Sequence, residues 1–219
     1  MKCTIRGEGL ATTFVVTDFT NDQTDHLAAL GFAVDGATAT RPVDEHSRYV
    51  EAAFHHLGRT LPAMLRQHQA GQPVPWQPAM GRLVRRLEAT DVEWGLIGSA
   101  ALAIRGVTVS PGDIDIVTTS RGADVIADLY RHELVFPVVN WPGAGLFGRA
   151  FDDCRVEWLG NDGESWAWTL SGASETIDWQ GHAVCVPPLD VQLRIEAQRG
   201  RAEHVRAIQA FLDSHPARI

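Results

Sequence analysis

The sequence predicts an α/β (α+β) fold: a mixed sheet flanked by helices, with a small α+β unit in front of it. Segments of strand and helix type alternate through residues 80–139, as in a sheet with crossover helices. Two later strand pairs are separated only by tight turns, at Asp152-Asp153 and Gln180-Gly181. Such turns join antiparallel neighbours, so a simple doubly wound parallel sheet is disfavoured.

The chain divides near residues 67–78, "QHQAGQPVPWQP", a stretch that contains three prolines and four glutamines and is typical of a connector. Residues 1–75 are therefore expected to form the small N-terminal unit, and residues 76–219 the main domain. A length of 219 residues is enough for one large or two small domains.

The N-terminal unit should contain one strand, one hairpin and two helices. The strand is expected over residues 10–19, followed by a short helix that ends at Gly31. Asp35-Gly36 is a typical turn for the hairpin. Helical periodicity then runs through residues 47–67, where Pro62 should kink or split the helix.

The main domain should continue with six alternating elements, two hairpins and two terminal helices. In order, we expect a helix over 80–87, a strand over 92–97, a helix over 99–106, a strand over 113–118, a helix over 122–133, a strand over 134–139, hairpin strands over 146–151 and 154–160, a second hairpin over 175–179 and 182–187, and helices over 189–199 and 202–213.

Composition narrows the function classes. A net charge of −8 weighs against a protein whose main task is stable nucleic-acid binding. No apolar run is long enough to span a membrane, and the first residues lack the apolar core of a signal peptide, so we expect a cytoplasmic protein without membrane contact. Three widely spaced cysteines argue against disulfides or a zinc site.

The segment "GDIDIV" places two carboxylates on one side of a strand. Residues i and i+2 face the same way, so Asp113 and Asp115 project together while Ile114 points into the core. Two ionised carboxylates about 4 Å apart repel by about 4 kcal/mol at an effective dielectric constant near 20. A shared proton or a divalent cation would offset this repulsion, and oxygen ligands suit Mg²⁺ or Mn²⁺.

A third acid, Glu157, lies in the middle of the apolar segment "CRVEWLG". If this strand neighbours the Asp113 strand, the three acids converge and could hold two metal ions. The alternative is a structural glutamate paired with Arg155 or Arg149. Asp152 and Asp153 are rival third acids, although a hairpin turn is their more natural place.

Gly98-Ser99 marks the change from an apolar strand to a helix in "GLIGSAALAIRG". Glycine allows close approach of a ligand to the backbone, and the serine hydroxyl and free N–H groups at a helix start can bind phosphate. A simple tight turn is the alternative.

Taken together, "LIGSAALAIRG…GDIDIV…VEW" resembles the DNA polymerase beta-like nucleotidyltransferase superfamily, and within it the small bacterial nucleotidyltransferase-like proteins. The resemblance covers about residues 80–215 and implies the fold of that superfamily. It implies that Asp113, Asp115 and Glu157 are catalytic and bind Mg²⁺ or Mn²⁺, and that Gly98 and Ser99 bind the nucleotide.

The resemblance implies a metal-dependent enzyme that moves a nucleoside monophosphate from a nucleoside triphosphate, such as ATP, to an acceptor hydroxyl and releases pyrophosphate. We expect a small-molecule acceptor, such as an antibiotic or metabolite. Two alternatives stay open: a toxin-type enzyme acting on RNA or protein, with an antitoxin as partner, or a catalytically dead fold that serves as a binding module. A homodimer is also compatible with the sequence.

Many members of the superfamily carry a basic residue shortly before the two aspartates, whereas "VTVSPGD" has none. Arg105 could substitute for it, or could only cap or pair on its own helix. Arg194, Arg199 and Arg201 on the terminal helices could also reach a triphosphate, or could lie on solvated helix faces.

Overall fold

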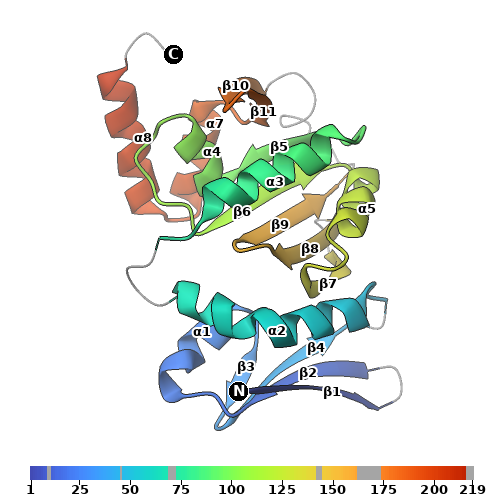
Figure 1. Ribbon diagram of the computed structural model, residues 1–219. Coiled ribbons are helices and arrows are strands. Elements are labelled where there is room, and N and C mark those ends of the chain that lie inside the picture. The colour runs from blue at the N-terminus through green and yellow to red at the C-terminus, as the bar shows by residue number, and fades with distance from the viewer. Residues whose placement is uncertain (9–10, 45, 69–72, 142–144, 162–173, 216–219) are drawn as a thin grey trace.

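The computed structural model describes residues 1–8, 11–44, 46–68, 73–141, 145–161 and 174–215. Figure 1 shows a five-stranded and a four-stranded sheet, with a long helix, α2 (Val50–His68), lying between them. The mixed α+β architecture predicted from the sequence is confirmed.

The larger sheet has the strand order β5-β6-β9-β8-β7. The central pair, β6 and β9, is parallel, and every other pair is antiparallel, so the sheet is mixed as expected. Its strands are β5 (Trp94–Ile97), β6 (Asp113–Thr118), β7 (Leu134–Trp141), β8 (Gly145–Phe151) and β9 (Arg155–Gly160).

One face of this sheet is covered by α3 (Trp76–Glu88) and α5 (Ser120–Leu129). Their apolar side chains share a buried core with Ile114 and Ile116 of β6 and with Trp158 of β9. Because side chains alternate along a strand, the residues between these positions must face the opposite side of the sheet.

The C-terminal part of the chain packs beside the larger sheet. A hairpin of β10 (Glu175–Trp179) and β11 (His182–Val186) turns at Gln180-Gly181, as predicted. The helices α4 (Gly98–Ile104), α7 (Leu189–Gln198) and α8 (Ala202–Ser214) lie together in Figure 1 and share a small apolar cluster.

The smaller sheet has the strand order β1-β2-β4-β3. The predicted hairpin turns at Asp35-Gly36, whereas the first strand was not expected. The elements are β1 (Lys2–Glu8), β2 (Ala11–Thr17), a 3-10 turn (Asn21–Gln23), α1 (Thr24–Ala29), β3 (Ala33–Asp35) and β4 (Thr38–Val43).

Helix α2 runs unbroken through Pro62, so the helix is not split there. Its Leu57 and Leu61 are buried in a core that also contains Val135 of β7 and Phe151 of β8. The N-terminal unit therefore packs directly against the larger sheet, and Figure 1 shows α2 in this position. The boundary between residues 75 and 76 stays a prediction.

Candidate active site

The parallel pairing of β6 with β9 brings the predicted acids to one side of the larger sheet. Asp115 is the register partner of Glu157, and Asp113 is the partner of Arg155. The buried neighbours Ile114 and Val156 fill the opposite face. The alternation inferred from "GDIDIV" thus extends across two strands, and the three carboxylates line one surface.

The Gly98-Ser99 turn lies against the same surface. Ile97, at the end of β5, pairs with Asp115. Gly98 has a φ of +67°, and a Cβ atom added to it would lie 2.8 Å from Oδ2 of Asp115. Only a glycine combines this backbone conformation with so close an approach to the carboxylate. The turn and the acids are therefore parts of one site.

Gln192, which sequence reasoning missed, holds this turn from α7. Its side chain is only 2% exposed, and its Nε2 donates a hydrogen bond of 2.6 Å to the carbonyl oxygen of Gly98. The signal available in the sequence was a polar residue between Leu189 and Leu193 on the apolar face of a helix. Such a residue needs a buried partner, but the sequence does not name it.

Two arginines form ion pairs with Asp113 and Glu157. Arg155 donates through Nη2 to Asp113, and its Nε lies 2.9 Å from Oε1 of Glu157. Arg149, on β8, places its Nε 2.8 Å from the same Glu157 oxygen. The pairing of Glu157 with Arg149 and Arg155, left open by the sequence, is thus present. All three side chains are at most 20% exposed, so solvent screens these ion pairs only partly.

Asp115 is the exception among the acids. No hydrogen bond or ion pair joins its carboxylate to another residue in the part of the chain that the structure describes. Burial and, to a smaller extent, the negative charges of Asp113 and Glu157 raise the pKa of Asp115 to about 8, although Arg155 and Arg199 act to lower it. The surroundings of Asp115 therefore favour its protonated form near neutral pH.

The carboxylate oxygens of Asp113 and Asp115 fit a divalent cation, because Mg²⁺ prefers oxygen ligands. A bound cation would also offset the repulsion between the two ionised carboxylates. Within the described ranges, however, no three His, Cys, Asp or Glu side chains are grouped as metal ligands. Glu157 is turned to its arginines instead. Its role as a third ligand stays a prediction.

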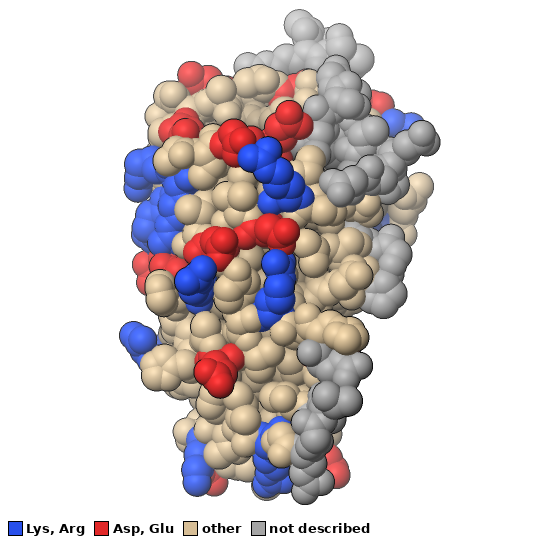
Figure 2. Space-filling view, turned by 90° about the vertical axis from the view of Figure 1, so that its right-hand side faces the viewer, with Lys and Arg blue, Asp and Glu red and all other residues tan. Residues whose placement is uncertain are grey.

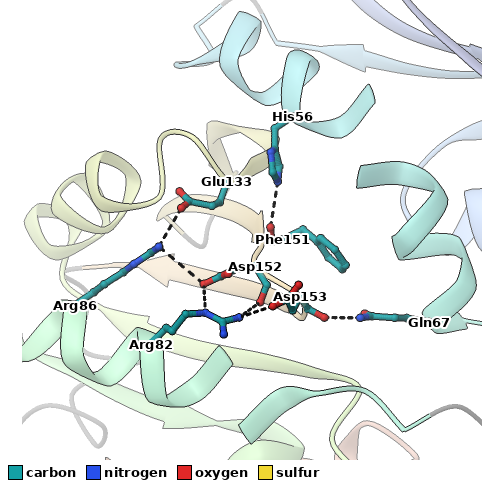
Figure 3. A network of polar contacts seen from close by, with 8 residues as sticks. All are labelled: His56, Gln67, Arg82, Arg86, Glu133, Phe151, Asp152 and Asp153. Carbon is teal, nitrogen blue, oxygen red and sulfur yellow. Dashed lines mark hydrogen bonds and ion pairs between the residues drawn. The ribbon is translucent and has the colours of Figure 1, made fainter. Parts of the chain in front are cut away.

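The rival acids serve another purpose. Figure 3 shows Asp152 and Asp153, in the turn between β8 and β9, facing Arg82 and Arg86 of α3. Arg82 Nε lies 2.8 Å from Asp152 Oδ2, and Arg82 Nη2 lies 3.1 Å from Asp153 Oδ2. On the side of α2, His56 contacts the carbonyl oxygen of Phe151 at the end of β8, and Gln67 donates to the carbonyl oxygen of Asp153. The acidic side chains therefore join the hairpin to α3, and its backbone carbonyls join it to α2.

Arg105 does not replace the basic residue that is missing before the aspartates. It pairs with Glu175 at 2.5 Å and donates to the carbonyl of Pro187, so it joins α4 to the C-terminal hairpin. The basic group beside Asp113 is instead Arg155, which comes from the neighbouring strand.

The distribution of charge on the surface agrees with the net charge of −8. On the face shown in Figure 2, acidic and basic side chains are interspersed and no continuous basic band is visible. Among the described residues, no helix has the length and apolar character needed to cross a membrane.

The mixed sheet, with an acid pair on β6 and a glycine turn against it, has the fold of nucleotidyltransferase-like proteins. Among solved structures, the chain is similar to a protein from Thermotoga maritima described as a candidate nucleotidyltransferase. The TM-score is 0.51 at 21% identity, over 68% of this chain and 99% of the other.

A second similar structure is an antigenic nucleotidyltransferase-like protein from Paracoccidioides brasiliensis, with a TM-score of 0.43 and 15% identity over 63% of this chain and 75% of the other. No family model matches the sequence, and no curated protein matches it. The similarity to the Thermotoga maritima structure identifies the fold and does not by itself assign a function.

Proposed function

We propose that the protein is a metal-dependent nucleotidyltransferase. The observation that carries this proposal is the close approach of Gly98 to Asp115, which places the Gly98-Ser99 turn directly beside the acid pair of β6. The similarity of the fold to nucleotidyltransferase-like proteins supports it.

In this proposal, Asp113 and Asp115 hold Mg²⁺ or Mn²⁺, Glu157 contributes as the third acid, and Gly98 with Ser99 binds the phosphates of a nucleoside triphosphate. The cation neutralises phosphate charge when it is bound. The hydroxyl oxygen of the acceptor forms a bond to the α-phosphorus, the bond to the bridging oxygen breaks, and pyrophosphate leaves. The hydroxyl proton passes to a carboxylate of the site or to water.

The acceptor we propose is a small molecule. The net charge of −8 and the interspersed charges in Figure 2 offer little to a polyanion such as RNA. A binding module without catalysis is the second candidate, because Glu157 is committed to Arg149 and Arg155.

Calorimetric titration tests the metal-dependent nucleotide binding that the proposed enzyme requires. Each of ATP, GTP, CTP and UTP is titrated into the protein with Mg²⁺ and again with EDTA, and the series is repeated with the Asp113→Ala/Asp115→Ala variant. We expect the wild type to bind at least one nucleotide only when metal is present, and the folded variant to bind none. Equal binding by both proteins, or binding that ignores EDTA, would contradict the metal-dependent enzyme.

The ion pairs of Arg155 lead to a prediction about metal affinity. Arg155→Gln should bind Mn²⁺ about tenfold or more tightly than the wild type, because the substitution removes a cation that competes for Asp113 and Glu157. Electron paramagnetic resonance of free Mn²⁺ measures this without any turnover. Arg121→Gln, which removes an exposed arginine paired with Asp91, is the control and should leave the affinity unchanged. Weaker Mn²⁺ binding by Arg155→Gln would show that Arg155 supports the metal site.

A further inference from the structure

The C-terminal helices carry three arginines near the site, and the structure distinguishes them. Arg194 lies 3.3 Å from Asp190, one turn earlier on α7. Arg201 lies 3.6 Å from the buried Glu196. Arg199, at the end of α7, is exposed, and no carboxylate pairs with it among the residues that the structure describes. Of the three, Arg199 alone keeps its guanidinium available.

Helical periodicity places Arg199 on the face of α7 that carries Gln192. Seven residues separate it from Gln192, which is close to two full turns, so both side chains leave the same face of the helix. That face also carries the buried Leu189 and Glu196. Gln192 fixes the face against Gly98 through its 2.6 Å hydrogen bond, and Gly98 in turn contacts Asp115.

The electrostatic effect of Arg199 on Asp115 agrees with a position of Arg199 near the site. The positive charge of Arg199 lowers the pKa of Asp115, which opposes the larger effect of burial. Arg199 is thus within electrostatic range of Asp115, and the placement of α7 itself follows from the bond of Gln192 to Gly98. Figure 1 shows α7 beside α4, the helix that begins at Gly98.

We propose that Arg199 binds the triphosphate group of the nucleotide and stabilises the charge of the departing pyrophosphate. This inference rests on the proposed function and extends it to a residue outside the two central strands. A guanidinium presents several N–H donors in a fixed plane and binds phosphate oxygens in pairs. It would add, from the end of α7, a positive charge that no carboxylate of the described residues neutralises.

The test compares Arg199→Gln with Arg194→Gln, a substitution that removes the same charge from the same helix. Each of the four nucleoside triphosphates, the corresponding monophosphates and free pyrophosphate is titrated with Mg²⁺. Arg199→Gln should weaken triphosphate and pyrophosphate binding about ten- to hundredfold and leave monophosphate binding nearly unchanged. Arg199→Lys should restore part of the loss, and Arg194→Gln should match the wild type.

The experiment distinguishes a failure of the inference about Arg199 from a failure of the proposed function. If the wild type binds a triphosphate and Arg199→Gln binds it equally well, or weakens mono- and triphosphate alike, the role of Arg199 is wrong and the proposed function stands. If the folded wild type binds no nucleotide with Mg²⁺ or Mn²⁺, the proposed function fails, and the inference about Arg199 fails with it.

Discussion

Gly98→Ala is expected to abolish nucleotide binding and to lower the free energy of unfolding. The new Cβ atom would lie 2.8 Å from Asp115 Oδ2, a distance shorter than van der Waals contact, in a backbone with φ of +67°. A left-handed conformation costs a non-glycine residue about 1–2 kcal/mol. The clash adds to this cost, because relief requires moving either the turn or the carboxylate. Chemical denaturation and nucleotide titration measure the two effects.

Gly36→Ala separates the clash from the backbone cost. Gly36 also has a positive φ, +55°, but a Cβ atom there would meet no atom within 4 Å. This variant should lose only the conformational cost and should bind nucleotide as the wild type does. If Gly98→Ala were no less stable than Gly36→Ala and bound nucleotide normally, the contact between the turn and Asp115 would have no functional meaning.

Local rules predicted the parts of the site that come from single segments. The two-residue period of a strand was enough to place Asp113 and Asp115 on one side, and the turn at Asp152-Asp153 followed from its residue types. The prediction that Glu157 lies beside Asp115 required one assumption, that the strands carrying these two residues are adjacent in the sheet. The fold satisfies that assumption through the parallel pairing of β6 with β9.

The other interactions of the site join segments that are far apart in the sequence. A sequence alone does not show which of many possible long-range pairs will form. Sequence alone offered Arg155 and Arg149 as partners for Glu157, but not the simultaneous pairing of Arg155 with Asp113. The hydrogen bond of Gln192 to Gly98 joins residues 94 positions apart.

The packing of α2 against β7 likewise gives residues 1–75 a structural connection to the larger sheet that no local pattern indicated.

Asp115→Asn should make the ligand-free protein more stable, by an amount that grows with pH. A free aspartate has a pKa of about 3.9, whereas burial and the adjacent acids raise the pKa of Asp115 to about 8 in the folded protein. Between these values the folded state binds the extra proton, so raising the pH destabilises the wild type by about 1.4 kcal/mol per pH unit at most. The destabilisation is complete above the folded pKa. An asparagine mimics the protonated form and removes this loss.

Denaturant unfolding of both proteins between pH 5 and pH 9 measures the difference, which should be small at pH 5 and reach a few kcal/mol above pH 8. Asp113→Asn is the matched control. It removes a carboxylate of the same strand that pairs with Arg155, and it leaves Asp115 buried, so it should keep most of the pH dependence. Mg²⁺ should stabilise the wild type and leave Asp115→Asn unchanged, since binding to the native state raises its stability. A pH-independent difference between Asp115→Asn and wild type would mean that Asp115 titrates normally, and the site would then have no unmet need for a cation.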